Sequence, residues 1–551
     1  MRKLSIQFLS LLALALISCS NMNNRTPSSI DSAPDYGSIF QKAREALVVK
    51  PGDKALRPAI KKMPEHEVVR MLMEENSLIG EDRANLLKAL EENSARSFAP
   101  VKGHTRLMPP IGQPGYSDLK IFVNHPYYAD DKLVPASNMI EIWRKFIMSA
   151  KKEIILNVFD FDLDVIAEAL IEKSKSGVTV KIGVDQKNVV SLRPEVAALV
   201  EHMKENGIDF TGVMPVGLNH QKMTALDWSL PDQAKVLFSS GNLTRSCLDP
   251  EGDLKGTDPL PPESVPNANH FLTMKSWILA NVVHHELTKT LDQGFLLRGR
   301  DYPLNGAYQV TGPGVDPNTL EAYPEPSLVV TFSPGGGMRK IGENIIADLI
   351  KREKGSIRML QFAYSSVAVD QALLFRAQKD FQETGKFDFM SVGDTPFALR
   401  EWSGFLGMSG YKLTIDKAKK TKVYSVDKSN PWVKGLSKPQ LNEVRSKVYV
   451  APKIYGNNWV KVAGKNTKVN AKIHHKVLAT PNFAILGTSF NFSEGAESNN
   501  EQILVIRDSG LSKIVSGMVK FMVENSPGTV AAEAQKRNVT PINDGEDDGE
   551  L

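Results

Sequence analysis

The sequence of 551 residues contains only two cysteines, Cys19 and Cys247. A scaffold held by disulfides is therefore excluded, and acylation of Cys19 would leave Cys247 without a partner in the chain. Beyond a short run near the start, no apolar stretch is long enough for a transmembrane helix. The net charge of +4 is too small to indicate a partner by itself. Composition thus indicates a globular chain that is long enough to bury a large core and form several domains.

The first residues have the pattern of a secretory signal peptide. A basic head, Met1–Lys3, precedes an apolar run from Phe8 to Ile17 that is too short to span a bilayer comfortably. The run closes with Leu16–Cys19, which resembles a bacterial lipoprotein signal. That resemblance implies cleavage before Cys19, its acylation and a lipid-anchored protein of the bacterial cell envelope. Because Ser20 is not the Asp of a retention signal, the outer membrane is favoured, facing the periplasm or the exterior. The alternative is an ordinary cleaved signal.

Composition shifts and periodicity divide the chain into five segments. Helical spacing of apolar residues marks 64–93, and a stretch rich in Pro, Gly and Asn near 305–326 reads as a linker. The last residues are acidic and predict a solvated tail. We expect a signal peptide at 1–18, a tether and helical N-terminal element at 19–119, a first α/β half at 120–305, a second at 306–526, and an acidic disordered tail at 527–551.

The two halves show the same order of predicted elements, strand, helix and strand with short connections, which is typical of a layered α/β sheet. In the first half we expect strands at 121–123, 153–159, 178–184 and 234–239, with helices at 140–148, 165–175 and 277–291. In the second half we expect strands at 328–332, 356–363, 387–392, 476–479, 483–486 and 503–506, with helices at 341–351, 369–377 and 511–524. The repeat predicts an internal duplication.

Each half carries a histidine and a lysine two residues apart. The first pair is His220 and Lys222, followed by Asp227, and the second is His474 and Lys476. In an extended strand, side chains two apart share a face, so each pair would project into one pocket. An imidazole that attacks or donates a proton, beside a fixed positive charge, suits a reaction in which a phosphate gains negative charge.

A turn of small residues that ends in asparagine follows each pair: residues 239–242, ending in Asn242, and residues 487–491, ending in Asn491. With these turns the sequence resembles the phospholipase D superfamily, whose pattern is HxKxxxxD followed by Gly-Ser-x-Asn, usually present twice. The resemblance extends over about residues 120–525. One such motif alone is weak, whereas two copies in a duplicated α/β chain are specific.

The resemblance implies two phospholipase D-like halves, each a mixed β-sheet flanked by helices, packed about a pseudo-two-fold axis as a monomer with an internal pseudo-dimer. One histidine would form a phosphohistidine and the other would protonate the leaving alcohol. By analogy we assign His220 as nucleophile and His474 as general acid. The lysines and asparagines would hold the phosphate oxygens, so that no metal or other cofactor is expected.

Two departures from the family pattern and one match to it bear on activity. Pro481 stands where the second copy should have Asp. Asn500–Glu501 matches the Asn-Glu that many members carry after the turn, and Glu501 would orient a catalytic imidazole. In the first half Asn269–His270 occupies the equivalent strand, which puts His270 in a Glu position.

Two further clusters have a functional and a plain interpretation. Asp160, Asp162 and Asp164 suggest a metal site, but their place at the start of a helix favours helix capping. The lysine-rich stretch from Lys412 to Lys476, interleaved with aromatic residues, fits either a solvated insertion or a surface for anionic headgroups or nucleic acid. The solvated insertion and the surface for an anionic ligand both stay open as interpretations of this stretch.

The sequence therefore predicts an enzyme that hydrolyses or transfers phosphodiesters of phospholipids through a phosphohistidine, at a membrane to which the lipidated Cys19 anchors it. A secreted nuclease of the same superfamily is the first alternative, since the same pocket would cleave DNA or RNA. A catalytically inactive binding relative is the second, because of Pro481 and His270. Apolar residues around the cleft would favour lipid, and a continuous basic groove would favour nucleic acid.

Overall fold

The computed structural model describes most of the chain from residue 115 to residue 541. The described residues are 105–107, 115–190, 194–213, 217–249, 265–293, 307–310, 328–333, 341–416, 421–455, 458–462, 465–469, 471–537 and 539–541. The expected signal peptide, Cys19 and the helical N-terminal element lie outside these residues, as does most of the expected linker. No helix among the described residues is both long enough and apolar enough to cross a membrane.

The first half is a seven-stranded mixed sheet in which the three strands at one edge pair in parallel and the other pairs are antiparallel. Its strands, in spatial order, are β2 (Ser117–Val123), β10 (His270–Lys275), β9 (Lys235–Ser239), β8 (Met223–Leu226), β5 (Glu153–Val158), β6 (Thr179–Asp185) and β7 (Asp209–Val213). Its helices are α6 (Met139–Met148), α7 (Asp164–Lys175), α8 (Gln186–Val190), α9 (Pro194–Glu205), α10 (Arg245–Leu248) and α11 (Trp277–Gln293).

Local sequence explains these elements. β5 reads Glu-Ile-Ile-Leu-Asn-Val and is buried beyond its first residue, as expected for a central strand covered on both faces. In α6 the apolar residues recur at helical spacing, so that Trp143 and Ile147 are buried while Lys145 faces solvent. The side chain of Asn138 caps this helix by accepting the N–H of Glu141.

The second half is built around a nine-stranded sheet. Its strands, in spatial order, are β1 (Thr105–Leu107), β11 (Ala307–Val310), β12 (Leu328–Ser333), β22 (Glu501–Arg507), β21 (Phe483–Leu486), β20 (Lys476–Ala479), β13 (Ile357–Gln361), β14 (Phe389–Gly393) and β17 (Val448–Val450). Its helices are α13 (Ile341–Arg352), α14 (Val367–Thr384), α15 (Thr395–Ala398), α16 (Gly404–Met408), α17 (Pro431–Gly435), α18 (Lys438–Arg445), α19 (Ser509–Glu524) and α20 (Val530–Lys536), with the 3₁₀ helix η4 (Glu494–Ser498).

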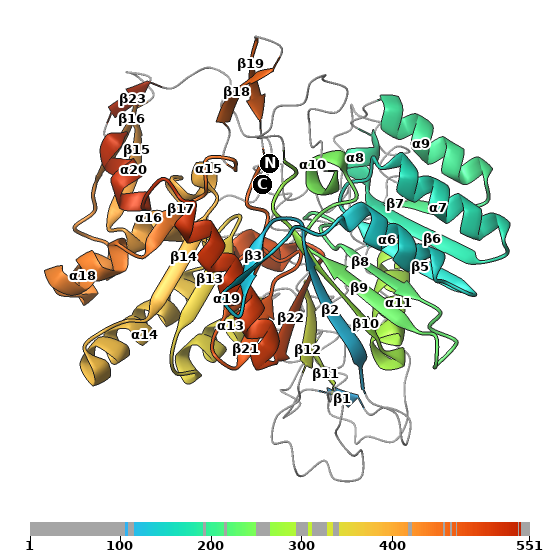
Figure 1. The fold of residues 1–551 in the computed structure, drawn as a ribbon, viewed down its shortest axis with the longest axis horizontal. Helices are drawn as coiled ribbons and strands as arrows, with labels where there is room; N and C mark the ends of the chain where they lie inside the picture. Colours follow the sequence, from blue (N-terminus) through green and yellow to red (C-terminus); the bar gives the residue numbers. More distant parts are fainter. Residues whose placement is uncertain are drawn as a thin grey trace, which may run out of the picture.

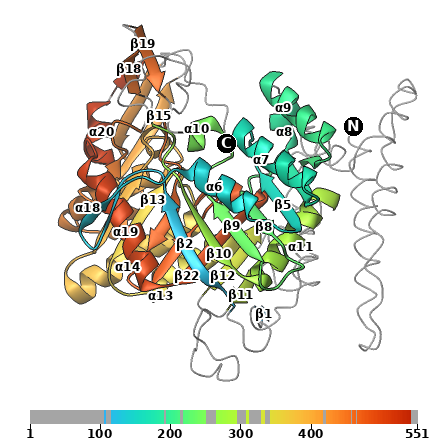
Figure 2. The same cartoon turned by 45° about the vertical axis from the view of Figure 1, so that its right-hand side comes forward.

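The two sheets repeat one topology. From β12 to β17 the second sheet has the same strand order and the same parallel and antiparallel pairings as the first sheet from β2 to β7. The halves lie side by side, the first in blue to lime and the second in yellow to red (Figures 1 and 2). This confirms the predicted mixed α/β fold with two phospholipase D-like halves.

One hydrophobic core belongs to both halves. It joins buried residues of the first sheet, such as Val236 and Leu272, to buried residues of the second, such as Val330 and Leu504. Each half also has a core of its own on the other side of its sheet. Helix α19 approaches β3 (Tyr127–Ala129) so closely that a Cβ at Gly517 would collide with the backbone of Tyr128. The shared core and this contact hold the halves together.

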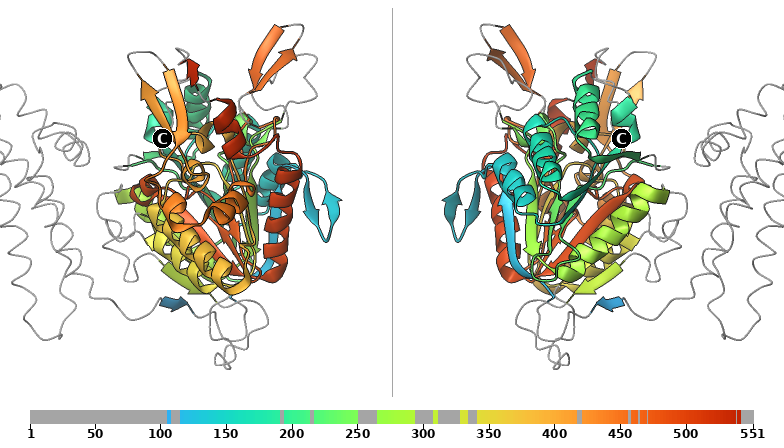
Figure 3. Two further views of the ribbon diagram at one scale, coloured as in Figure 1. Left: turned by 90° about the vertical axis from the view of Figure 1, so that its left-hand side faces the viewer. Right: turned by 90° about the vertical axis from the view of Figure 1, so that its right-hand side faces the viewer.

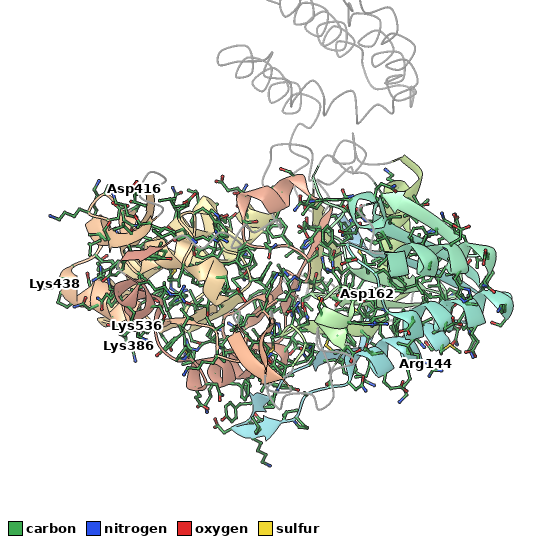
Figure 4. All side chains as sticks on the ribbon, turned by 90° about the horizontal axis from the view of Figure 1, so that it is seen from above. Arg144, Asp162, Lys386, Asp416, Lys438 and Lys536 are labelled. Carbon is green, nitrogen blue, oxygen red and sulfur yellow. The ribbon has the colours of Figure 1, made fainter. Side chains whose placement is uncertain are left out.

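The structure corrects three local predictions. Strand β8 begins at Met223, so His220 and Lys222 lie in the extended segment before it. The N-cap of α7 is Leu163, which offers no side-chain acceptor, and Asp162 instead accepts the N–H of Arg245 (Figure 4). The acidic tail does not begin at 527, because residues 530–536 form α20, whose apolar side bears the buried Val530.

The second half also carries additions. β15 (Tyr411–Asp416), β16 (Thr421–Val426) and β23 (Val539–Pro541) form a small sheet, and β18 (Asn458–Val462) pairs with β19 (Lys465–Val469) in a hairpin that projects from the body (Figures 1 and 3). β3 pairs with β4 (Lys132–Val134) in a third small sheet beside α19 (Figure 1). These elements leave the repeated sheets intact.

Candidate active site

The segments that carry the two HxK pairs pair with backbone of the opposite half. Asn219, just before His220, bridges Asn500 in parallel, and Ile473, just before His474, bridges Ala268 in the same sense. Backbone hydrogen bonds of 2.8–2.9 Å fix these contacts, including that from the N–H of His474 to the carbonyl of Ala268. Glu501 follows Asn500, and its carboxylate therefore lies next to the imidazole of His220. Asn269 follows Ala268 and lies next to the imidazole of His474 in the same way.

His220 is held by a carboxylate of the second half. Its Nδ1 lies 2.9 and 2.8 Å from the two oxygens of Glu501, and both side chains are almost fully buried. A carboxylate only accepts, so Nδ1 carries the proton and the lone pair of Nε2 is free to attack. Burial lowers the pKa of His220 to about 4, although Glu501 acts in the opposite direction. The ring edge also contacts Phe159, which limits its rotation.

His474 is held by an amide instead. Its Nδ1 lies 3.0 Å from Oδ1 of Asn269, whose Nδ2 donates to the carbonyls of Cys247 and Asn267. Those two bonds fix the amide orientation, so Oδ1 must accept and Nδ1 of His474 must carry the proton. Nε2 is then the acceptor for Nζ of Lys476, 3.1 Å away. Burial, with the neighbouring lysines, lowers the pKa of His474 well below its ordinary value.

The two lysines place buried positive charge between the imidazoles. Lys222 and Lys476 are both fully buried, and Nζ of each donates to the carbonyl of the histidine two residues earlier. Burial lowers the pKa of Lys222 to about 8 and that of Lys476 well below its ordinary value, and the charge of Lys222 lowers the pKa of Lys476 further. Because a buried cation pair is costly without a counterion, the arrangement favours binding an anion.

The small-residue turns adjoin the residues that hold the histidines. Ser240 donates to Oδ1 of Asn269 at 3.0 Å, and Ser489 occupies the same place beside Gln502, which follows Glu501. Asn242 and Asn491 lie two residues beyond these serines, and within the described residues neither Oδ1 has a hydrogen-bond partner despite being buried. A phosphate oxygen at the lysines would accept from the Nδ2 of these amides and not bind their Oδ1 atoms.

The register shows which residue of the first half corresponds to Glu501. The backbone N–H of His270 donates to Ser240, and that of Gln502 donates to Ser489. His270 is therefore the counterpart of Gln502, and Asn269 is the counterpart of Glu501. The prediction that His270 occupies the Glu position is wrong by one residue. Sequence reasoning missed Asn269 because it aligned Asn269–His270 with Asn500–Glu501, one residue away from the register that the structure shows.

His270 instead ends a chain of three buried histidines. Nδ1 of His125 lies 2.7 Å from the carbonyl of Pro126, its Nε2 lies 2.7 Å from Nε2 of His475, and Nδ1 of His475 lies 2.9 Å from Nδ1 of His270. Because the carbonyl of Pro126 accepts, Nδ1 of His125 carries the proton, and its Nε2 accepts from Nε2 of His475. Nδ1 of His475 then accepts from Nδ1 of His270. Burial lowers the pKa of His125 to about 4 and that of His270 to about 3. The chain is neutral and links the halves.

Asp227, predicted as a site residue, lies elsewhere. Its carboxylate accepts the backbone N–H groups of Lys151, Lys152 and Glu153 at 2.7–3.0 Å, where β5 begins. Five residues of extended chain separate it from Lys222, about 16 Å at the rise of a strand. Asp227 therefore fastens β8 to β5 and cannot touch a phosphate at the lysines. Pro481 packs by Gly355 at the same end of the second sheet, so its replacement of Asp leaves the site itself unchanged.

Besides Lys476, the described part of the lysine-rich stretch places Lys472 near the site, where its Nζ lies 5.6 Å from the Phe362 ring centre. Much of the rest forms the additions to the second half, and Lys438 in α18 lies at its outer end (Figure 4). Three of the interleaved aromatic residues, Tyr424, Trp432 and Tyr455, are buried in the cores and so cannot stack on a ligand.

Comparisons with known proteins give a family model and several solved structures that are similar to parts of this chain. Residues 143–254 match the family model described as "Cardiolipin synthase, PLD-like domain". No curated protein sequence matches the chain. Among solved structures, the phospholipase D family member Nuc from Salmonella typhimurium is 19% identical over 32% of this chain and 97% of its own, with a TM-score of 0.24. Phosphatidylserine synthase from Haemophilus influenzae is 10% identical over 83% and 91%, with a TM-score of 0.41.

The duplicated mixed α/β fold brings two histidine–lysine pairs together at the joint of its halves. The match of residues 143–254 to the PLD-like domain model supports membership of the phospholipase D superfamily. Members of this superfamily are phosphodiesterases and phosphotransferases.

Proposed function

We propose that this protein is a phospholipase D-type enzyme that hydrolyses or transfers the phosphodiester of phospholipids through a phosphohistidine on His220. The observation that carries the proposal is the unequal support of the two imidazoles. A carboxylate, Glu501, faces Nδ1 of His220, whereas a neutral amide, Asn269, faces Nδ1 of His474. Only the first partner stabilises the positive charge that an imidazole gains when Nε2 bonds to phosphorus.

In the first step the lone pair on Nε2 of His220 attacks phosphorus, and the bond to the leaving alcohol breaks. Nε2 of His474 must then hold a proton to give to that oxygen. The nearby Lys476 ammonium and the lowered pKa of His474 keep this nitrogen unprotonated while the site lacks an anion. A bound phosphodiester offsets the lysine charges and so raises the pKa of His474 toward protonation.

In the second step His474, now neutral, accepts a proton from water or from an acceptor alcohol. The activated oxygen attacks phosphorus, the N–P bond breaks, and Nε2 of His220 regains its lone pair. Lys222, Lys476, Asn242 and Asn491 hold the non-bridging oxygens in both steps. Because the lysines supply the positive charge that a metal would otherwise provide, activity should not depend on a metal ion.

Two observations favour a phospholipid over a nucleic acid. Val165 and Val367 are exposed at the start of α7 and α14, the helices that follow β5 and β13. Phe159 and Phe362, against the two imidazoles, directly follow the same strands, so apolar side chains lie at the rim of the site. The family model that residues 143–254 match is described as that of cardiolipin synthase, whose name refers to a phospholipid.

We further propose that acylated Cys19 anchors the protein to an envelope membrane, with the site next to its substrate. A secreted nuclease would use the same pocket, and a binding relative would use it without turnover. We also propose that the two halves of the enzyme extend over residues 120–305 and 306–526.

The test is a substrate panel on purified protein. Bis-(p-nitrophenyl) phosphate, phospholipid vesicles and single- and double-stranded DNA and RNA are each assayed with and without EDTA and with and without an acceptor alcohol. We expect turnover of the diester and of phospholipid that EDTA does not change. Faster turnover of nucleic acid would favour the nuclease, and no turnover of any substrate would favour the binding relative.

A further inference from the structure

A buried carboxylate lies behind each HxK pair. Asp185 is the last residue of β6, and its Oδ2 accepts the N–H of Asn219 at 2.7 Å. Asp394 directly follows β14, and its Oδ2 accepts the N–H of Ile473 at 2.9 Å. Both side chains are buried, at 3% and 0% exposed.

The two aspartates occupy equivalent places in the duplicated fold. In the first sheet the last pair of β5 and β6 is Val158 with Val184, and Asp185 comes next. In the second sheet the last pair of β13 and β14 is Gln361 with Gly393, after which Asp394 follows. The residues that orient the two histidines differ between the halves, so an unchanged aspartate with an unchanged contact indicates a shared requirement.

The contact that each aspartate makes is also the one that matters most for the site's geometry. Asn219 and Ile473 directly precede the catalytic histidines, and they form the two bridges to the opposite half. A carboxylate that accepts these N–H groups therefore holds the backbone just before each histidine in place. Through the bridge it also sets the position of His220 relative to Glu501 and of His474 relative to Asn269. A displacement of about 1 Å at such a point is enough to cost on the order of 100-fold in rate.

The carboxylates also face the charges of the site. Lys222 and Lys187 act on Asp185, and Lys472 and Lys476 act on Asp394. Burial raises the pKa of both groups, to about 7 for Asp394, while those lysines and the backbone N–H groups act against it. The charge of the lysine of each HxK pair thus acts on the aspartate behind that pair.

We propose that Asp185 and Asp394 are positioning residues, each setting the entry of one HxK segment, so that Asp185 governs attack by His220 and Asp394 governs proton transfer by His474. The inference rests on the proposed function, because it assigns one aspartate to each chemical step. It adds a prediction that a purely structural role would not give. The rate lost on removing Asp394 should depend on the leaving group, and the rate lost on removing Asp185 should not.

The experiment compares first-turnover rates on two diesters. Bis-(p-nitrophenyl) phosphate expels a stable phenolate and needs little help from an acid, whereas a short-chain phosphatidylcholine expels an alkoxide and needs a proton. Release of p-nitrophenolate or choline is followed in a single turnover for wild type, Asp185→Ala and Asp394→Ala, for both Asp→Asn variants, and for His474→Ala.

We expect Asp394→Ala to lose about 100-fold on phosphatidylcholine and less than about 3-fold on the p-nitrophenyl diester, as His474→Ala should. Asp185→Ala should lose about 100-fold on both. The Asn variants, which keep an acceptor oxygen for the backbone N–H, should recover part of each loss. Asp370→Asn is the matched control: this buried carboxylate accepts Tyr364 and Trp432, so its loss should lower the Tm without any dependence on the leaving group.

The outcomes separate the two claims. If His474→Ala shows the leaving-group dependence and Asp394→Ala does not, the inference is wrong while the proposed function stands. If Asp185→Ala and Asp370→Asn behave alike, Asp185 has only a structural role and the inference is equally wrong. A wild-type protein that turns over neither diester overturns the proposed function and the inference with it. Melting temperatures of all variants show that the rates come from folded protein.

Discussion

The two halves of the molecule share a topology but differ in the residue that orients each histidine. The first half offers Asn269 to His474, while the second offers Glu501 to His220. The residue between His and Lys is Gln221 in one copy and His475 in the other. The fold thus supplies two equivalent places for an imidazole, and the side chains around them give the two imidazoles different tasks.

The comparison teaches that the duplication conserves geometry and varies charge. The bridges, the serine that holds each strand start, and the two aspartates recur in both halves. The charge of the orienting partner does not recur. A carboxylate raises the basicity and cation stability of His220, whereas the amide leaves His474 free to give up its proton.

The largest effect should come from removing either imidazole. His220→Ala and His474→Ala should each lower steady-state kcat on every diester by at least about 10⁴-fold, because nucleophile and acid–base group act as a unit. Steady-state assays with matched melting temperatures measure this. Retention of a tenth of the activity in either variant would contradict a shared site.

A smaller effect should distinguish the two orienting partners. Glu501→Gln keeps a hydrogen bond to Nδ1 but removes the charge, and should lower kcat about 100-fold. Asn269→Ala should lower it about 10-fold, since a neutral partner is lost. Asn269→Asp gives His474 a carboxylate partner like the one at His220. The limb of the kcat–pH profile that His474 sets should then move to higher pH, because a carboxylate raises the pKa of His474. Equal losses in Glu501→Gln and Asn269→Ala would break the comparison between the halves.

A third test concerns the ends of the two sheets that lie away from the site. Asp227 in the first half and Pro481 in the second occupy equivalent positions there. Asp227→Ala leaves three backbone N–H groups without their acceptor, and should lower the free energy of unfolding by about 2 kcal/mol or more. The rate per folded molecule should not change. Glu383→Ala, which removes an exposed carboxylate of a surface ion pair, serves as control and should change stability little. A loss of kcat in folded Asp227→Ala would return Asp227 to the site.

The smallest effect tests the histidine chain. Histidines whose pKa is lower in the folded than in the unfolded state bind fewer protons when folded, so stability is complete above about pH 6.5 and falls as pH decreases toward 4. His270→Gln copies the residue that the second half carries, Gln502, and removes one of these groups. The slope of unfolding free energy against pH should flatten by about 1.4 kcal/mol per pH unit between pH 6 and 4. Urea unfolding across this range measures it, and an unchanged slope would show that His270 is protonated in the fold.

Much of the fold could be predicted from the sequence, because hydrophobic periodicity and short connections specify strands and helices locally. The duplicated mixed sheet is confirmed, and the two HxK pairs were found because their residue types and spacing are chemical signals. Their catalytic roles stay predictions. The lipoprotein signal, the anchor at Cys19 and the domain boundaries likewise remain predictions.

What the sequence could not provide were partners from the opposite half. Asn269 orients a histidine 205 residues away, and the His125–His475 contact spans 350 residues. Neither has a local pattern, because nothing in the neighbouring residues records which distant strand end will face it. The same holds for Asp227, whose motif position suggests the site although the strand carries it to the opposite end of the sheet.

The central claim, that two unequal imidazoles serve one phosphorus, is tested most directly by trapping the intermediate. His474→Ala is mixed with bis-(p-nitrophenyl) phosphate, quenched in alkali after one turnover, and digested for mass spectrometry. Attack should still occur while the second step, which needs His474 as base, stalls. A phosphoryl adduct on residue 220 is the predicted result, and an adduct elsewhere, or a full burst of p-nitrophenolate with no adduct, would contradict the account.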